Sequence, residues 1–160
     1  MMDPHVRAEQ VKEYMDVVWP NRRDIKPIVK VLESGCIKWL RSKSTSGYPL
    51  LTRRVDDKPI TLLVTRIIAC GFFDEIDDYN FDALVCHTCD YPSCINPDHF
   101  FFGDYHDNTI DSIEKGRNYN SNLTHCLRGH EFTPENTQTR IRNSRIGRQC
   151  KECYKKLRGE

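Results

Sequence analysis

Cysteine and histidine side chains gather in the centre of the sequence, between residues 86 and 99. Cys89, Cys94 and His99 follow one another at intervals of five residues, with turn-forming residues between them. Thiolate and imidazole groups are the ligands that structural zinc prefers, and short loops can wrap a chain around one ion. The spacing predicts a zinc site. Its fourth ligand is left open between Cys86, which forms a CxxC pair with Cys89, and Cys36, which precedes a predicted strand.

A second set of zinc ligands follows near the end of the sequence. Three residues separate Cys126 from His130, two separate Cys150 from Cys153, and 19 residues lie between the two pairs. Two short pairs at such a spacing are typical of zinc ribbons. We therefore predict a second structural zinc on these four residues, with His125 as the neighbour that competes for the same position.

Both zinc predictions assume that the thiols are reduced. The first ten residues, MMDPHVRAEQ, lack the apolar segment of a secretory signal peptide, and no apolar run approaches the roughly 20 residues that cross a bilayer. We expect a cytoplasmic protein without a membrane partner, in which cysteines bind metal rather than form disulfides. Hydrophobic residues make up only 38% of the chain, so bound metal would supplement a limited core.

The net charge of +1 conceals three segments of different charge. Residues 1–70 carry 13 Lys and Arg against 8 Asp and Glu, and residues 71–114 carry 11 acidic residues with no Lys or Arg. Residues 115–160 carry 11 basic against 4 acidic residues. The basic segments favour nucleic-acid binding, whereas the acidic centre fits cation binding or solvation alone.

The run CHTCDYPSCINPDHFFFGDYHDNTIDSIEKGR, residues 86–117, resembles the signature of phage-type HNH endonucleases. Its order of cysteine and histidine also resembles that of the His-Cys box homing endonucleases, and both groups belong to the ββα-metal nuclease class. Upstream, SGCIKW, the pair Gly47-Tyr48 and VTRIIA occupy the places of matching family segments. The resemblance therefore covers about residues 34–118.

This resemblance implies a role for each matching residue. His87 takes the place of the general base, and Asn108 takes the place of the ligand to the catalytic divalent cation. Cys36 takes the place of the fourth zinc ligand, which leaves Cys86 as a free thiol outside the site. Asn96 matches the middle asparagine of the HNH signature, which in the family fastens the loop through hydrogen bonds to the backbone.

One position departs from the family pattern. Many HNH enzymes carry an acidic second metal ligand just before the base histidine, where this chain has Cys86. The His-Cys box arrangement, in which Asn108 is the main protein ligand and DNA oxygens and water complete the coordination, fits better. Asp107 and His106 stay open as contributors. The chemistry agrees, because an imidazole can deprotonate water near neutral pH and Mg²⁺ can stabilise charge on a phosphate.

Arginine side chains are the predicted DNA contacts. Arg66 takes the place of the arginine in the family's frequent His-Arg pair, and Arg53 and Arg54 lie on a neighbouring predicted strand. In the tail, a cationic loop would bind backbone phosphates through four arginines: Arg140, Arg142, Arg145 and Arg148.

The elements that must position these residues can also be predicted. Asp3-Pro4 and the helical spacing of Val11, Tyr14, Met15 and Val18 predict an amphipathic packing or dimerisation helix over residues 4–18. Alternating and β-branched residues between turn signals predict an antiparallel sheet of about three strands over residues 29–70, although residues 61–69 also fit a helix. Polar residues 118–124 predict a linker.

Together these features predict an α+β protein with three parts. Residues 1–28 form an N-terminal helix and connection, residues 29–117 a zinc-stabilised ββα-metal nuclease domain with a small antiparallel sheet, and residues 118–160 a basic zinc-ribbon-like tail. The predicted function is hydrolysis of phosphodiester bonds in double-stranded DNA, with two structural zinc ions and one catalytic Mg²⁺ or another divalent cation.

Two rival functions remain. A non-catalytic zinc-dependent DNA-binding protein could keep the scaffold without the chemistry. An RNA-processing nuclease would share the chemistry, but few aromatic residues lie near the basic segments for base stacking. We expect a phage-encoded protein in a bacterial host, or a protein located wherever its target DNA lies in a eukaryotic or viral setting. The sequence leaves open a monomer that nicks or a homodimer that cuts both strands.

Overall fold

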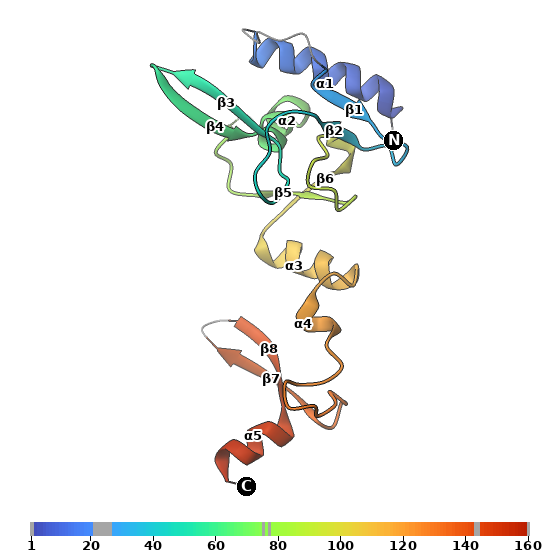
Figure 1. The fold of residues 1–160 in the computed structure, drawn as a ribbon, viewed down its shortest axis with the longest axis vertical. Helices are drawn as coiled ribbons and strands as arrows, with labels where there is room; N and C mark the ends of the chain where they lie inside the picture. The colour runs from blue at the N-terminus through green and yellow to red at the C-terminus, as the bar shows by residue number, and fades with distance from the viewer. Residues whose placement is uncertain (1, 21–26, 75, 77, 143–144, 160) are drawn as a thin grey trace. The chain divides into compact units, whose positions relative to one another are not determined.

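A computed structural model describes residues 2–20, 27–74, 76, 78–142 and 145–159 (Figure 1). The chain divides into two compact units, Met1–His106 and Asp107–Glu160, and each combines helices with small antiparallel sheets. The predicted α+β class is therefore confirmed. The division falls inside helix α3 (Tyr105–Glu114), earlier in the chain than the predicted boundary at residue 117. Within the described ranges, no helix combines the length and the apolar composition of a membrane span.

The N-terminal helix forms where the spacing of apolar residues predicts it. Helix α1 (Pro4–Val18) begins after Asp3, whose side chain accepts a hydrogen bond of 2.7 Å from the backbone N–H of His5. The helix buries Ala8, Val11 and Met15, which follow one another at helical spacing. It therefore packs against its own unit.

The prediction of one sheet of about three strands is wrong, because the strands form two separate hairpins. Strands β1 (Val29–Val31) and β2 (Ile37–Trp39) make one antiparallel pair, and β3 (Leu50–Val55) and β4 (Lys58–Leu63) make the other. Helix α2 (Val64–Phe72) follows β4 directly, so the apolar run 61–69 is divided between a strand and a helix. The division follows burial, since Val64, Ile67 and Ile68 form one buried helical face.

The central cysteine-rich segment lies between two short strands. Strand β5 (Leu84–His87) pairs antiparallel with β6 (Phe100–Gly103), so that His87 lies opposite Phe100. A short 3₁₀ helix, η1 (Pro97–His99), ends the loop between them, and α3 follows β6 in the chain. The order of elements is thus two antiparallel strands and then a helix.

A single hydrophobic core holds the first unit together. It joins residues from α1, both N-terminal hairpins, α2 and the β5–β6 segment. Its buried members are Ala8, Val11, Met15, Ile28, Val29, Ile37, Trp39, Leu51, Val64, Ile67, Ile68, Ile95 and Phe100. The two N-terminal hairpins and the loop that carries the predicted zinc ligands therefore pack against one common core.

The second unit contains helix α4 (Tyr119–Asn122), strands β7 (Thr137–Arg142) and β8 (Arg145–Cys150), and helix α5 (Lys151–Arg158). The predicted linker 118–124 thus includes a helical turn, capped by the Asn118 side chain, and the predicted arginine loop is a β-hairpin. Among the described residues of this unit, Cys150 is the one apolar side chain that is buried. The described part of this unit therefore has no core comparable to that of the first unit.

Candidate metal sites and active centre

Four ligands of the predicted first zinc site lie together in the first unit. The ligand atoms of Cys36, Cys89, Cys94 and His99 all lie within 4.8 Å of one another. The Sγ atoms of Cys36 and Cys94 are each 3.6 Å from His99 Nδ1. A tetrahedral zinc with bonds of about 2.0–2.3 Å needs ligand atoms about 3.3–3.8 Å apart, so the cluster fits zinc. Of the two candidates for the fourth position, Cys36 completes this cluster, and Cys86 is not among its members.

Asn96 fastens this cluster. Its side chain is only 2% exposed, and Nδ2 donates to the carbonyl of Gly35 at 3.0 Å while Oδ1 accepts from the N–H of Asp98 at 3.1 Å. The backbone N–H of Asn96 points at Cys94 Sγ from 3.4 Å. The hydrogen bonds to the backbone that were predicted for Asn96 are present. They connect the turn that carries Cys36 to the loop that carries the other ligands.

One further contact holds the loop from the N-terminal side, and the turn before Cys36 requires a glycine. Arg7 of α1 donates to both carboxylate oxygens of Asp98, at 2.8 and 3.3 Å. Gly35 has φ +79°, and a Cβ there would lie 3.5 Å from Pro4 and 3.8 Å from the His99 ring. Glycine suits this position because the left-handed backbone strains other residues. Sequence reasoning missed Arg7 and Asp98, since a single pair 91 residues apart has no local pattern.

Burial explains why this cluster needs a cation. Desolvation raises the pKa of the Cys94 thiol, and the pKa of Cys89 is raised first by burial and further by neighbouring Cys36. Buried thiols resist ionisation unless a positive charge compensates the thiolates. A bound zinc ion would supply that charge.

The second predicted set is also assembled, within the second unit. The ligand atoms of Cys126, His130, Cys150 and Cys153 lie within 4.8 Å of one another. His130 Nδ1 lies 3.5 Å from Cys126 Sγ and 3.2 Å from Cys153 Sγ, and the two sulfurs are 3.7 Å apart. These separations again match a tetrahedral zinc site. His125 is outside the set and lies 2.9 Å from the Thr124 hydroxyl through its Nδ1.

Two thiols of the second cluster differ, because the surroundings of Cys126 favour thiolate, whereas desolvation and the neighbouring thiols Cys126 and Cys150 raise the pKa of Cys153 to about 11. Desolvation raises the pKa of Cys126, but backbone N–H groups of Arg128 and His130 and the neighbouring ligands outweigh it and lower the pKa to about 6. Zinc binds the thiolate form. Glu152, which sequence reasoning missed, lies 3.3 Å from His130 Nε2 through Oε2, an arrangement that orients an imidazole whose other nitrogen binds metal.

His87, the predicted general base, ends strand β5 beside the first cluster. It is 8% exposed, and its Nε2 lies 3.0 Å from the carbonyl oxygen of Cys94. The Phe100 ring packs edge-on at 5.2 Å between centroids, and the Tyr48 ring lies at 6.3 Å. Burial is the largest effect on the His87 pKa and lowers it below 6.5, although the Cys94 carbonyl acts in the opposite direction. The imidazole is therefore neutral at physiological pH.

Asn108, the predicted ligand of the catalytic cation, is an exposed residue of α3. Its neighbours Asp104, His106 and Asp107 are also exposed, and their ligand atoms lie within 4.8 Å of one another. Carboxylate and amide oxygens suit a hard cation such as Mg²⁺. His87 and Asn108 belong to different units, so their pairing stays a prediction.

The structure gives Arg66 a role in holding the fold, and its contact with DNA stays a prediction. Its Nε donates to the carbonyl of Tyr79 at 2.9 Å, Nη1 donates to Ala83 at 3.1 Å, and Nη2 donates to Phe81. The guanidinium also lies 3.8 Å from the centroid of the Phe81 ring. Arg66 therefore anchors residues 79–83, because a planar fork of donors can satisfy several carbonyl oxygens at once.

The remaining predicted arginines differ from one another. Arg53 and Arg54 are exposed on β3, and Arg140 is exposed on β7. Arg148 donates through Nη2 to two backbone carbonyls, so it is partly structural. The side chains of Arg142 and Arg145 lie outside the described part of the structure.

No family profile and no solved structure matches the chain. The chain is 28% identical over 98 residues to Protein 2.8 of Escherichia phage T7. The match covers 61% of this chain and 63% of the phage protein, so it spans less than two thirds of that relative. This similarity fits the predicted phage origin, and the relative's name states no activity.

Proposed function

We propose that the protein is a zinc-stabilised DNA endonuclease in which His87 is the general base. The observation that carries the proposal is the contact between His87 Nε2 and the Cys94 carbonyl, at 3.0 Å. A carbonyl oxygen only accepts hydrogen bonds, so Nε2 carries the proton of the neutral ring and Nδ1 carries the lone pair. The zinc loop thereby fixes the tautomer that a general base requires.

The proposed reaction is hydrolysis of a phosphodiester. His87 Nδ1 takes a proton from water, the water oxygen forms a bond to phosphorus, and the bond from phosphorus to the leaving oxygen breaks. Asn108 Oδ1 would hold a divalent cation on α3, together with oxygen atoms of DNA and water. Such a cation, when bound, supplies positive charge to the phosphate and to the leaving oxygen.

Exposed basic residues support DNA as the substrate. In the first unit they lie on the β3–β4 hairpin, and in the second unit they lie on β7 and α5. They include Arg53, Arg54, Arg140, Lys155, Lys156 and Arg158. Such residues contact phosphates and release counterions from the DNA backbone.

The second candidate is a zinc-dependent DNA-binding protein without catalysis. Two assembled Cys₃His clusters and the basic surface would serve a binding protein equally well. The two candidates differ in one respect, which is that a pure binding protein has no reason to retain His87 and Asn108 together.

Cleavage of supercoiled plasmid separates the two candidates. With Mg²⁺, the wild-type protein should give open-circular or linear DNA. His87→Ala should cleave about 10²–10⁴-fold more slowly, the usual contribution of a general base. Asn108→Ala should regain part of its activity at raised Mg²⁺ or Mn²⁺, which His87→Ala should not.

The control is His125→Ala, which removes an exposed histidine outside both clusters and should cleave like wild type. Zinc content and circular dichroism would verify that each variant folds. A zinc-loaded wild-type protein that binds DNA without cleaving it, whichever divalent cation is added, would establish the non-catalytic binding protein instead.

A further inference from the structure

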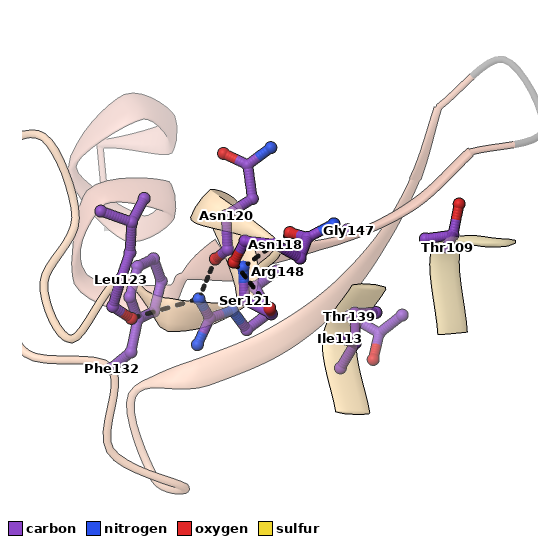
Figure 2. Close-up of a pocket in the computed structure, with 10 residues that line it drawn as sticks. All are labelled: Thr109, Ile113, Asn118, Asn120, Ser121, Leu123, Phe132, Thr139, Gly147 and Arg148. Carbon is purple, nitrogen blue, oxygen red and sulfur yellow. Dashed lines mark hydrogen bonds between the residues drawn. The ribbon is translucent and has the colours of Figure 1, made fainter. Parts of the chain in front are cut away.

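A pocket of about 530 Å³ lies in the second unit, among α3, α4, β7 and β8 (Figure 2). Most of its polar lining is uncharged, and none of its lining residues is acidic. The polar residues that matter here are Thr109, Asn120, Ser121, Thr139 and Arg148. The volume lies within the roughly 300–1,000 Å³ typical of ligand sites. The proposed nuclease chemistry makes no use of this pocket.

Arg148 is fixed at this pocket. Its Nη2 donates to the backbone carbonyls of Asn120 and Leu123, the latter at 3.1 Å, as the dashed lines in Figure 2 show. Its guanidinium lies 4.8 Å from the centroid of the Phe132 ring. In the described part of the chain, no carboxylate forms an ion pair with Arg148. A positive group is thus held in place without a counter-charge.

We propose that this pocket binds one phosphodiester group of the DNA backbone. Phosphate oxygens accept hydrogen bonds from arginine, hydroxyl and asparagine side chains, and the pocket offers all three without a repelling carboxylate. The apolar lining residues Ile113 and Leu123 suit a deoxyribose beside the phosphate. A stacked base fits less well, because Arg148 already covers the Phe132 ring.

The inference rests on the proposed function, since it names a contact to the same DNA. A test of this inference needs one variant that disturbs the pocket and a control variant with the same change of charge outside the pocket. Thr139 pairs with Arg148 across the β7–β8 hairpin and is exposed, so Thr139→Glu places a negative charge beside the guanidinium. Gln138→Glu makes the same change of charge one residue earlier, on the opposite face of the strand and outside the pocket lining.

The test measures binding of the zinc-loaded full chain to a fluorescent DNA duplex over a series of salt concentrations, without added divalent cation. We expect Thr139→Glu to weaken binding about tenfold or more, as expected for loss of a charge-assisted hydrogen bond. The slope of log K against log salt should become less negative by about 0.9, which is the contribution of one phosphate contact. Gln138→Glu should retain the wild-type slope, and Thr139→Val, which removes only the hydroxyl, should show a smaller loss of affinity.

Equal losses in Thr139→Glu and Gln138→Glu would overturn the pocket inference and leave the proposed function intact. A wild-type protein that binds no DNA would overturn both. In a separate experiment, inorganic phosphate is titrated into the protein and followed by NMR. Shifts of the pocket amides with free phosphate, together with unchanged DNA affinity in Thr139→Glu, would mean that the pocket takes a free anion instead of a DNA strand.

Discussion

His87 combines burial with one fixed hydrogen bond, and this combination determines when it can act as a base. Burial disfavours the imidazolium and lowers the pKa below 6.5, His99 nearby acts in the same direction, and Asp90 opposes them. A base must be neutral to accept a proton, so a lower pKa extends its working range toward acidic pH. The Cys94 carbonyl therefore orients the His87 ring, and burial keeps that ring neutral.

The first prediction follows from this shift of the His87 pKa. The cleavage rate should fall only below pH 6.5, because the protonated fraction of His87 becomes large only below its lowered pKa. Cleavage rates measured across the acidic range would show where the acid limb lies. Asp90→Asn should move the limb to still lower pH, since Asp90 raises the pKa and asparagine tolerates its positive φ of 56°. A limb above pH 6.5 would count against His87 as the base.

Asn96→Ala is the second prediction at the level of single residues. The substitution removes two side-chain hydrogen bonds and leaves the Gly35 carbonyl and the Asp98 N–H without those partners. Groups left unsatisfied near a buried site cost about 1–3 kcal/mol each, so the free energy of unfolding should fall by about 2–6 kcal/mol. Urea unfolding would measure the change. Asn80→Ala, at an exposed asparagine, should stay within about 0.5 kcal/mol of wild type.

Among the elements, the β3–β4 hairpin and the α2 helix carry arginines in different surroundings. Residues 52–61 of the hairpin are exposed on both faces, so Arg54 has no packing function there. Arg66 on α2 instead donates to carbonyls of residues 79, 81 and 83. The two arginines therefore give a matched pair for separating DNA contact from fold stability.

The third prediction concerns this pair. Arg54→Gln should reduce the slope of log K against log salt for DNA binding by about 0.9 and leave the melting temperature unchanged. Arg66→Gln should do the reverse, lowering the melting temperature while the salt slope stays at its wild-type value. Binding titrations and thermal melts of both variants would decide. A shallower salt dependence in Arg66→Gln with no loss of stability would instead support the predicted DNA contact of this residue.

The elements also show how far a sequence can be interpreted. The α1 helix and both ligand clusters could be predicted, because helical periodicity and metal-ligand spacing are local properties of the sequence. The choice of Cys36 over Cys86 came from the family resemblance, since spacing alone fits either. Residues 61–69 could not be divided between β4 and α2, because the break depends on which side chains meet the core. The role of Arg66 was missed for the same reason, since its carbonyl partners are tertiary.

At the scale of the whole molecule, the two units depend on different sources of stability. The first unit buries a core of aliphatic and aromatic side chains in addition to its metal cluster. Among its described residues, the second unit buries only Cys150, so a metal ion bound at its cluster would supply most of its folding free energy. The clusters also differ in access, since three of the four first-site ligands are buried but only one of the second.

The last prediction uses this difference. The purified protein should contain two zinc ions per chain, one for each Cys₃His cluster. A chelator should empty the second site first, because its ligands are more exposed, and residues 107–160 should then lose their dispersed amide signals while the first unit keeps its own. Metal analysis and NMR during chelation would follow both events. Cys153→Ser should reproduce the loss in the second unit alone, whereas Cys36→Ser should destabilise the first unit without removing its core. A second unit that stays folded after its zinc is lost would show that residues outside the cluster hold it together.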